Sequence, residues 1–171
     1  MELLHESEMN NIPILIPVKG ISRRCPGKNR KLLPYTADYL LRQNLIKNAV
    51  VISDDQELGD FASRLGFKTN VEIRKEGQDE LSSCRNFIKN SDYEAFILLP
   101  VTQPFRETDL IRKCYSLYTE VKDELDFVTS FVEIPDRKRF YLEFTESVPA
   151  FRNKDMKRKG ALCYSDRKSV V

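Results

Sequence analysis

Continuous apolar runs separated by helix-length segments are the feature that most restricts how this chain can fold. The runs Ile12–Val18, Ala49–Ile52 and Ala95–Leu99 show no alternation of polar and apolar side chains, which is typical of strands buried on both faces. The segments between them carry apolar side chains at helical spacing. Strands that alternate with helices in this way predict an α/β fold with a parallel sheet and crossover helices.

Each predicted helix has a recognisable starting residue. The candidate N-caps are Thr36 (for a helix from Tyr35 to Ile46), Asp54, Asp79 and Thr108. Asp54 has Glu57 three positions later, as a capping box requires, and Gly66 closes that helix. Shorter strands are predicted at Phe67–Ile73, Asp126–Val132 and Gly160–Tyr164.

The segment that follows the first strand is rich in basic residues. Six lysines and arginines, and no acidic residue, occur between Asn11 and Ala37. Backbone N–H groups and lysines that converge at the carboxyl end of a buried strand form phosphate sites in many α/β proteins. A solvated basic loop is the alternative, and charge alone would favour it. The position and glycine content of this loop favour a phosphate site.

The loop is neither a P-loop nor a dinucleotide fingerprint. A P-loop needs a glycine five positions before the glycine of its Gly-Lys pair, and a Ser or Thr after the lysine. Around Gly27-Lys28 these positions hold Ser22 and Asn29, so the hydroxyl that would bind magnesium is missing. The pattern G-x-G-x-x-G does not occur in the chain.

The cysteine and histidine content and the lengths of the apolar runs argue against several other classes of protein. The four cysteines form no C-x-x-C pair, so we expect reduced thiols and neither a zinc site nor a disulfide framework. The single histidine, His5, lies in an N-terminal tail of residues 1–11, which argues against a histidine-activated nucleophile. No apolar run reaches the roughly 18 residues that span a bilayer. The acidic N-terminus is unlike a signal peptide, so a cytoplasmic location is expected.

Five motifs in order connect this chain to one family. The loop Lys19–Asn29 reads K-G-I-S-R-R-C-P-G-K-N, and the later motifs are Val50–Asp55, Asp79–Ser83, Leu98–Arg106, and Phe151–Arg152 with Gly160–Tyr164. Together they resemble the acylneuraminate cytidylyltransferases, whose corresponding loop reads A-R-G-G-S-K-R-x-P-G-K-N. The matches run from about Ile14 to Tyr164, so we expect residues 12–165 to form one cytidylyltransferase domain.

The resemblance implies a Rossmann-like, three-layer α/β/α fold of the nucleotide-diphospho-sugar transferase type, with a mostly parallel sheet. It implies transfer of CMP from CTP to the anomeric hydroxyl of a sialic-acid-like nonulosonic acid, with release of pyrophosphate, in cell-surface polysaccharide biosynthesis. The implied cofactor is Mg²⁺, with ligands in a C-terminal segment that this chain lacks. A homodimer is implied for the full-length protein, with no nucleic acid or membrane partner.

The same resemblance assigns roles to particular residues. Lys28 and Lys19 are the expected catalytic residues, because they would neutralise the charge of the triphosphate. The residues expected around CTP are Ser22, Arg24, Asn29, Arg74 and Ser82. Those expected around the sugar acid are Gln103, Arg106 and Arg152, since an arginine fork suits a carboxylate.

Some of these residues also have a purely structural interpretation. Ser82 could simply belong to the first turn of its helix, and Arg106 could be a solvated loop residue. Cys25, inside the basic loop, is interpreted as a tolerated small residue and not as a nucleophile. Asp54 and Asp55 could bind a metal at the strand end, but helix capping explains Asp54 more simply.

Departures from the family pattern leave other functions open. Lys19 replaces an arginine, which keeps the charge but loses the bidentate fork, and Pro100 replaces a glutamine. A cytidylyltransferase for an octulosonic, legionaminic or pseudaminic acid is therefore an alternative. A non-catalytic fragment that binds a nucleotide or RNA is an alternative of another class.

The last part of the sequence departs most from the pattern. Residues 136–159 form a charged excursion that resembles part of the family's substrate and dimerisation region. The last six residues, Asp166–Val171, equal the translation of a common sequencing-adapter string. We therefore expect them to be a read-through artefact, and we expect the natural gene to continue.

Sequencing the locus across the codon for Ser165 tests this expectation. Native DNA should diverge from the adapter string at this point and encode further residues, aspartates among them. Native DNA that encodes Asp166–Val171 and then a stop codon would show the expectation to be wrong.

Overall fold

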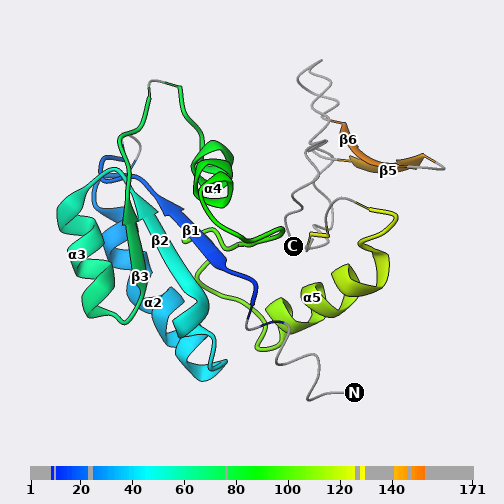
Figure 1. Ribbon diagram of the computed structural model, residues 1–171, viewed down its shortest axis with the longest axis horizontal. Coiled ribbons are helices and arrows are strands. Elements are labelled where there is room, and N and C mark those ends of the chain that lie inside the picture. The colour runs from blue at the N-terminus through cyan, green and yellow to red at the C-terminus, as the bar shows by residue number, and fades with distance from the viewer. Residues whose placement is uncertain are drawn as a thin grey trace.

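A four-stranded parallel sheet forms the centre of the fold (Figure 1). The computed structural model describes residues 9, 11–22, 25–75, 77–125, 128–129, 141–145 and 148–152. The strands are β1 (Ile14–Val18), β2 (Ala49–Ser53), β3 (Lys68–Val71) and β4 (Ile97–Leu98), in the order β3-β2-β1-β4. All three pairings are parallel, so the predicted sheet is confirmed.

The two central strands are the ones with continuous apolar sequence. Ile14 of β1 pairs with Ala49 of β2 on one side and with Ile97 of β4 on the other. All five residues of β1 and all five of β2 are buried, as the lack of alternation predicts. β3 lies at the edge and has mostly exposed side chains, which explains why its sequence is more polar.

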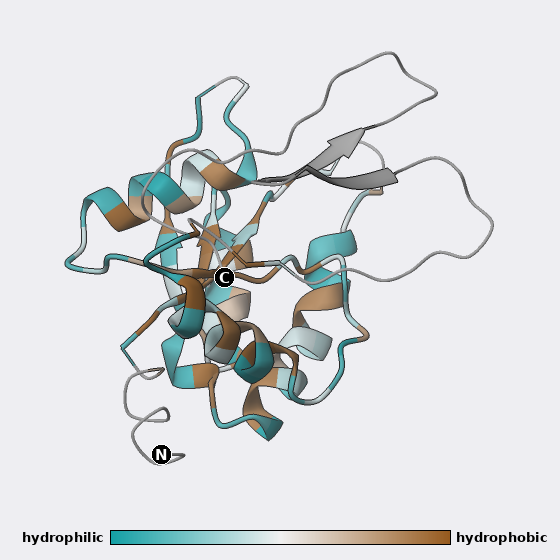
Figure 2. Cartoon of the chain, turned by 90° about the vertical axis from the view of Figure 1, so that its right-hand side faces the viewer, coloured by the Kyte–Doolittle hydropathy of each residue, from teal (hydrophilic) through white to brown (hydrophobic). Residues whose placement is uncertain are grey.

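Helices cover both faces of the sheet, and this confirms the three-layer fold. One hydrophobic cluster joins the side chains of β1 that point to one face with α2 (Lys28–Arg42), α3 (Gln56–Arg64) and α5 (Leu110–Val121). A second cluster joins Leu15, Val50 and Ile52 with α4 (Glu80–Lys89). A short 3-10 helix, η1 (Ile46–Asn48), precedes β2. Figure 2 shows apolar residues concentrated where the helices meet the sheet.

The prediction that the first helix begins at Tyr35 with Thr36 as its cap is wrong. α2 begins at Lys28, after Gly27 in the left-handed region at φ 71°, and Pro34 lies inside it. Pro34 removes one intrahelical hydrogen bond. The helix continues past Pro34 because Leu33 is buried on the same face as Ala37 and Leu40. Thr36 is fully buried within this helix.

Thr108 does not cap α5, so that prediction is also wrong. Asp109 occupies the N-cap position and makes no side-chain capping bond, whereas the carbonyl of Thr108 lies 3.4 Å from the Tyr39 hydroxyl that donates to it. The buried positions of α5 are Ile111 and Tyr115. Leu117 is exposed, because two residues rotate a helix by roughly 200° from the buried Tyr115.

The remaining described strands form an antiparallel hairpin of β5 (Tyr141–Thr145) and β6 (Val148–Arg152). It falls within the predicted excursion of residues 136–159. The predicted strand at Gly160–Tyr164 and the expected artefact at Asp166–Val171 lie outside the described residues, as does most of the predicted strand at Asp126–Val132. Within the described residues, no helix is both long enough and apolar enough to cross a membrane.

The cysteines that the structure describes are free thiols, as the sequence predicted. Cys25 is exposed, Cys114 is half-buried, and Cys84 is buried against the second face of the sheet. Burial raises the pKa of the Cys84 thiol to about 12, because the thiolate would be poorly solvated there. Cys84 is therefore a packing residue.

Two adjacent leucines of α2 test the assignment of its buried stripe. Leu40 is fully buried and Leu41 is 57% exposed. Leu40→Ala should lower the free energy of unfolding by about 2–5 kcal/mol, because it leaves a cavity in the core. Leu41→Ala should change it by less than about 0.5 kcal/mol. Urea unfolding followed by circular dichroism would measure both, and equal losses would contradict the helix register described here.

Candidate functional site

β1 and β2 end side by side at the carboxyl edge of the sheet (Figure 1). A small cleft opens there. Its volume is about 100 Å³, and four of the residues predicted from sequence line it: Lys19, Ser22, Lys28 and Asn29. Gly20, Gly27, Arg30, Asp55, Glu57 and Leu58 complete the lining. Residues of the predicted basic loop therefore line a depression at this edge of the sheet.

Hydrogen bonds hold both ends of this loop. The backbone N–H of Gly20 donates to Asp54 Oδ1 at 2.8 Å, which ties the loop to the end of β2. The side-chain amide of Asn29 donates to the carbonyl of Lys19 at 2.7 Å, which ties the start of α2 to the end of β1. A Cβ at Gly20 would lie 2.4 Å from the Cβ of Asp55. Glycine is thus the residue that this close approach allows.

Asp54 holds the loop, and the prediction that it caps α3 is wrong by one residue. Asp55 is the N-cap, and its Oδ1 accepts the N–H of Leu58 at 2.8 Å. The hydroxyl of Ser53 accepts the N–H of Asp55 at 3.1 Å and steadies this turn. Because Asp55 is the cap, Glu57 is not at the capping-box position.

The first turn of α2 is electrostatically open. Gly27 provides no side-chain cap, and the first turn contains no acidic residue. By contrast, α3 and α4 begin with capping aspartates and have Glu57 and Glu80 in their first turns. The Lys28 N–H donates to the carbonyl of Cys25 at 3.3 Å. The positive end of the α2 dipole still favours an anion that enters the cleft between Lys19 and Lys28.

Arg74 reaches the same sheet edge from the segment that follows β3. Its Nε donates to Glu72 Oε1 at 2.8 Å, and its Nη2 donates to the carbonyl of Val18, the last residue of β1, at 3.4 Å. The Arg74 side chain is only 6% exposed, and its Nη1 is buried and has no hydrogen-bond partner among the described residues. A buried donor without a partner is costly in a folded protein, so Nη1 is a candidate ligand-binding atom.

Ser82 lies in the first turn of α4, and its contacts are with Asp79, the capping residue of this helix. Its backbone N–H donates to Asp79 Oδ1 at 2.7 Å, which confirms Asp79 as the cap. Hydrogen bonds from the hydroxyl and the N–H of Ser82 lower the pKa of the Asp79 carboxyl. This structural role was one of the two interpretations of Ser82.

Arg106 is held inside the protein, so its interpretation as a solvated loop residue is wrong. Its Nη2 donates to the carbonyl of Pro100, and its guanidinium lies 5.5 Å from the ring centroid of Tyr39. Burial lowers the pKa of Arg106 and raises that of Tyr39. Arg106 and Gln103 line a cavity of about 180 Å³ beside β4, so the structure brings together two of the three residues predicted for the sugar acid.

Other predicted features lie outside what the structure describes or outside this site. Arg24 is outside the described residues, and Arg152 is described only as the last residue of β6. Among the described residues, no three His, Cys, Asp or Glu side chains come together as a metal site. Asp54 and Asp55 each use Oδ1 for a backbone N–H. Two carboxylates alone do not make an all-protein site for a metal ion.

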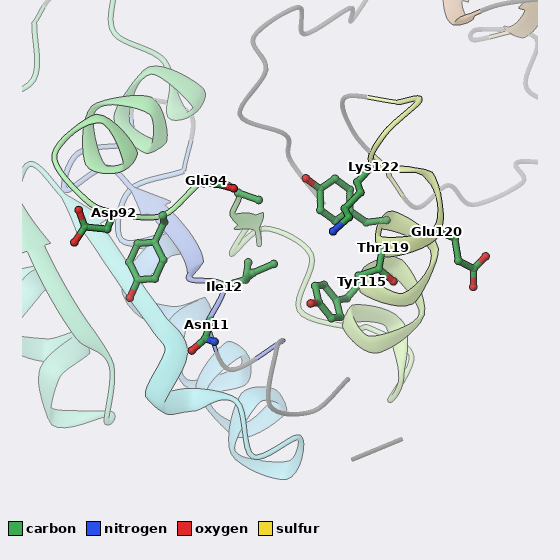
Figure 3. A pocket seen from close by; sticks show the side chains of 11 residues that line it. Asn11, Ile12, Asp92, Glu94, Tyr115, Thr119, Glu120 and Lys122 are labelled. Atoms are coloured by element: carbon green, nitrogen blue, oxygen red, sulfur yellow. The ribbon is translucent and has the colours of Figure 1, made fainter. Parts of the chain in front are cut away.

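A second, wider cleft lies at the opposite edge of the sheet and contains no predicted site residue. Its volume is about 660 Å³, and it lies between α5 and the segments that precede β1 and β4 (Figure 3). Asn11, Ile12, Tyr115 and Lys122 are among its lining residues. In parallel α/β sheets, ligands bind at the carboxyl ends of the strands, so the smaller basic cleft is the better candidate.

Comparison with known sequences finds relatives of one kind. The chain is 25% identical over 166 residues to pseudaminic acid cytidylyltransferase of Campylobacter jejuni subsp. jejuni serotype O:2, over 88% of this chain and 71% of that protein. It is 30% identical over 115 residues to N-acylneuraminate cytidylyltransferase of Escherichia coli O18:K1:H7, over 61% of this chain and 27% of that protein. No protein-family model matches the chain.

A solved structure confirms the fold type. CMP:2-keto-3-deoxy-manno-octonic acid synthetase, complexed with CTP, superposes with a TM-score of 0.57 at 16% sequence identity. The match covers 64% of this chain, and the chain spans about half (48%) of that protein. Both the resemblance to cytidylyltransferases and the nucleotide-sugar transferase fold predicted from sequence are therefore confirmed.

Proposed function

We propose that this homologue of the pseudaminic acid and N-acylneuraminate cytidylyltransferases transfers CMP from CTP to the anomeric hydroxyl of a nonulosonic acid and releases pyrophosphate. The observation that carries the proposal is the basic cleft between Lys19 and Lys28, which opens onto the uncapped start of α2. The homology supports the same class of reaction, since both kinds of relative are named for cytidylyl transfer to an acidic sugar.

The reaction requires charge neutralisation more than covalent help. The sugar hydroxyl attacks the α-phosphorus and forms a new P–O bond, while the bond from that phosphorus to the bridging oxygen of the β-phosphate breaks. The hydroxyl loses its proton, and negative charge accumulates on the departing pyrophosphate. Alignment of the two oxygens and fixed positive charge therefore determine the rate.

Lys19 and Lys28 supply that positive charge in this proposal. They line the cleft at the two ends of the loop, and the start of α2 adds the positive end of its dipole. Asn29 acts by holding Lys19 in place through its carbonyl. Ser22 lines the same cleft, and Arg24 is proposed to contact the nucleotide on the resemblance alone.

The remaining predicted residues are proposed to contact the nucleoside or the sugar acid. Arg74 at the end of β1 is proposed to contact the nucleoside, with Ser82 nearby in the first turn of α4. Gln103 and Arg106 line the cavity beside β4, and with Arg152 they are proposed to contact the sugar acid. An arginine near that cavity suits the carboxylate of such a substrate.

Mg²⁺ is part of the proposal through the resemblance alone. In nucleotidyl transfer the ion neutralises phosphate charge and is held largely by substrate oxygens. The described residues do not fit a protein-held ion, so no step above depends on one.

Pseudaminic acid is a specific candidate for the sugar acid, because the match to a pseudaminic acid cytidylyltransferase runs over 88% of this chain and the match to the N-acylneuraminate enzyme over 61%. A cytoplasmic location, a homodimer and a role in cell-surface polysaccharide synthesis belong to the same proposal. Formation of CMP-sugar from a panel of nonulosonic and octulosonic acids would identify the substrate.

Replacing Lys28 tests the proposed mechanism. In the protein expressed from its natural locus, with Mg²⁺ and CTP, pyrophosphate should be released only when an acid substrate is added. Lys28→Ala should lower kcat by about 10²–10³-fold, the usual effect of losing one preorganised charge-stabilising group. Lys31→Ala is the matched control, because Lys31 lies exposed on the same helix outside the cleft. Undiminished turnover of Lys28→Ala would remove this mechanism.

Cys25 reports on loop occupancy without any assay of activity. It is exposed in the loop, and its carbonyl accepts the N–H of Lys28 at 3.3 Å. Bound CTP should slow its alkylation by iodoacetamide several-fold, because the nucleotide would cover the loop. GTP at the same concentration should protect it less. Cys84 is an internal standard, since its pKa of about 12 leaves almost no thiolate at pH 8. Equal Cys25 rates with and without CTP, read by peptide mass spectrometry, would contradict nucleotide binding at this loop.

A further inference from the structure

Glu72 and Gln78 belong to a part-buried hydrogen-bond network that neither the sequence motifs nor the proposed mechanism uses. Glu72 Oε1 accepts from Arg74 Nε at 2.8 Å and from Gln78 Nε2 at 3.2 Å. Gln78 Nε2 also lies 3.1 Å from the hydroxyl of Ser83, which is fully buried in the first turn of α4. The network therefore connects the end of β3 to the start of α4.

The same network fixes the direction of the Arg74 guanidinium. Glu72 engages Nε from one side, and the carbonyl of Val18 accepts from Nη2 on another. The third nitrogen, Nη1, is buried and lacks a partner among the described residues. A planar guanidinium with two of its nitrogens held has little freedom to rotate, so these contacts determine where Nη1 points.

The charge of this pair differs from that of the basic cleft. The Glu72 and Arg74 side chains are only 13% and 6% exposed, and their opposite charges cancel at 2.8 Å. A neutralised arginine has little excess attraction for a triphosphate, but it can still donate a hydrogen bond to a neutral oxygen or nitrogen. The lysines of the cleft, Lys19 and Lys28, have the complementary property. The pair thus suits the base or ribose, and the lysines suit the phosphates.

We propose that Glu72, supported by Gln78, is a positioning residue that aims Arg74 Nη1 at an uncharged acceptor on the nucleoside part of the bound nucleotide. This inference rests on the proposed function. Glu72 does not contact the nucleotide in this arrangement and acts only through Arg74.

Binding of cytidine, CMP and CTP, measured by calorimetry, tests the inference. Glu72→Gln keeps the shape of the side chain and removes its charge, and it should weaken binding of all three ligands by a similar factor of about ten to a hundred. The factor should be similar because the affected contact is to the nucleoside that they share. Gln78→Ala, which leaves the ion pair intact, should weaken binding by a smaller factor. Asp38→Asn is the matched control, since it removes a carboxylate from an exposed pair with Arg42.

A double-mutant cycle separates positioning from a general effect on the fold. If Glu72 acts only through Arg74, Glu72→Gln should have no further effect on binding in the Arg74→Ala background. Glu72→Asp should restore part of the affinity, and in steady state the KM for CTP should rise more than kcat falls. Circular dichroism melts would establish that each variant is folded.

The outcomes separate the inference from the proposed function. A wild-type chain that binds no cytidine nucleotide would overturn both. A wild-type chain that binds CTP, with Glu72→Gln equally tight, would overturn the inference alone. A loss for CTP without a loss for cytidine would show that Arg74 serves the phosphates, and it would also overturn the inference. Additive losses in the double variant would show that Glu72 acts independently of Arg74.

Discussion

The parallel pairing of β1 with β2 is the interaction on which the rest of this structure depends. Val18 pairs with Ser53, so β1 and β2 end at neighbouring positions and the residues that follow them lie side by side. Gly20 donates to Asp54 at this point, and no side chain larger than hydrogen fits at Gly20 beside Asp55. This contact holds the start of the loop at Gly20, and burial of both strands on both faces keeps the contact in place.

The helices that begin at this edge of the sheet differ in their capping residues and in the charge of their first turns. α3 and α4 satisfy their first N–H groups with Asp55 and Asp79, which neutralises the positive ends of their dipoles. α2 has neither a capping side chain nor an acidic first turn. The capped starts of α3 and α4 offer an anion less attraction than the start of α2, which is where the triphosphate is proposed to lie.

The strands and the basic cleft could be predicted from sequence because each depends on residues that are close together in the chain. A short continuous apolar run directly predicts a buried strand. The lysines of the cleft lie close together in the sequence of one loop, so the sequence also predicts the cleft. The helix starts were less predictable: Asp54 and Asp55 are equivalent candidates until the contact with Gly20 distinguishes them. Glu72 and Gln78 carry no motif, because the pairing of Glu72 with Arg74 and with Gln78 follows from the turn between β3 and α4.

α2 links the two halves of the proposed site. It begins at Lys28 in the basic cleft and carries Tyr39 three turns later. The Tyr39 hydroxyl donates to the carbonyl of Glu107 at 3.2 Å, and its ring lies against the guanidinium of Arg106. The loop after β4 is therefore positioned by the same rigid element that presents Lys28. A helix buried along Leu33, Ala37 and Leu40 cannot shift at one end without shifting at the other. The distance between the proposed phosphate site and the proposed sugar-acid site is thus set by the packing of α2 on the sheet.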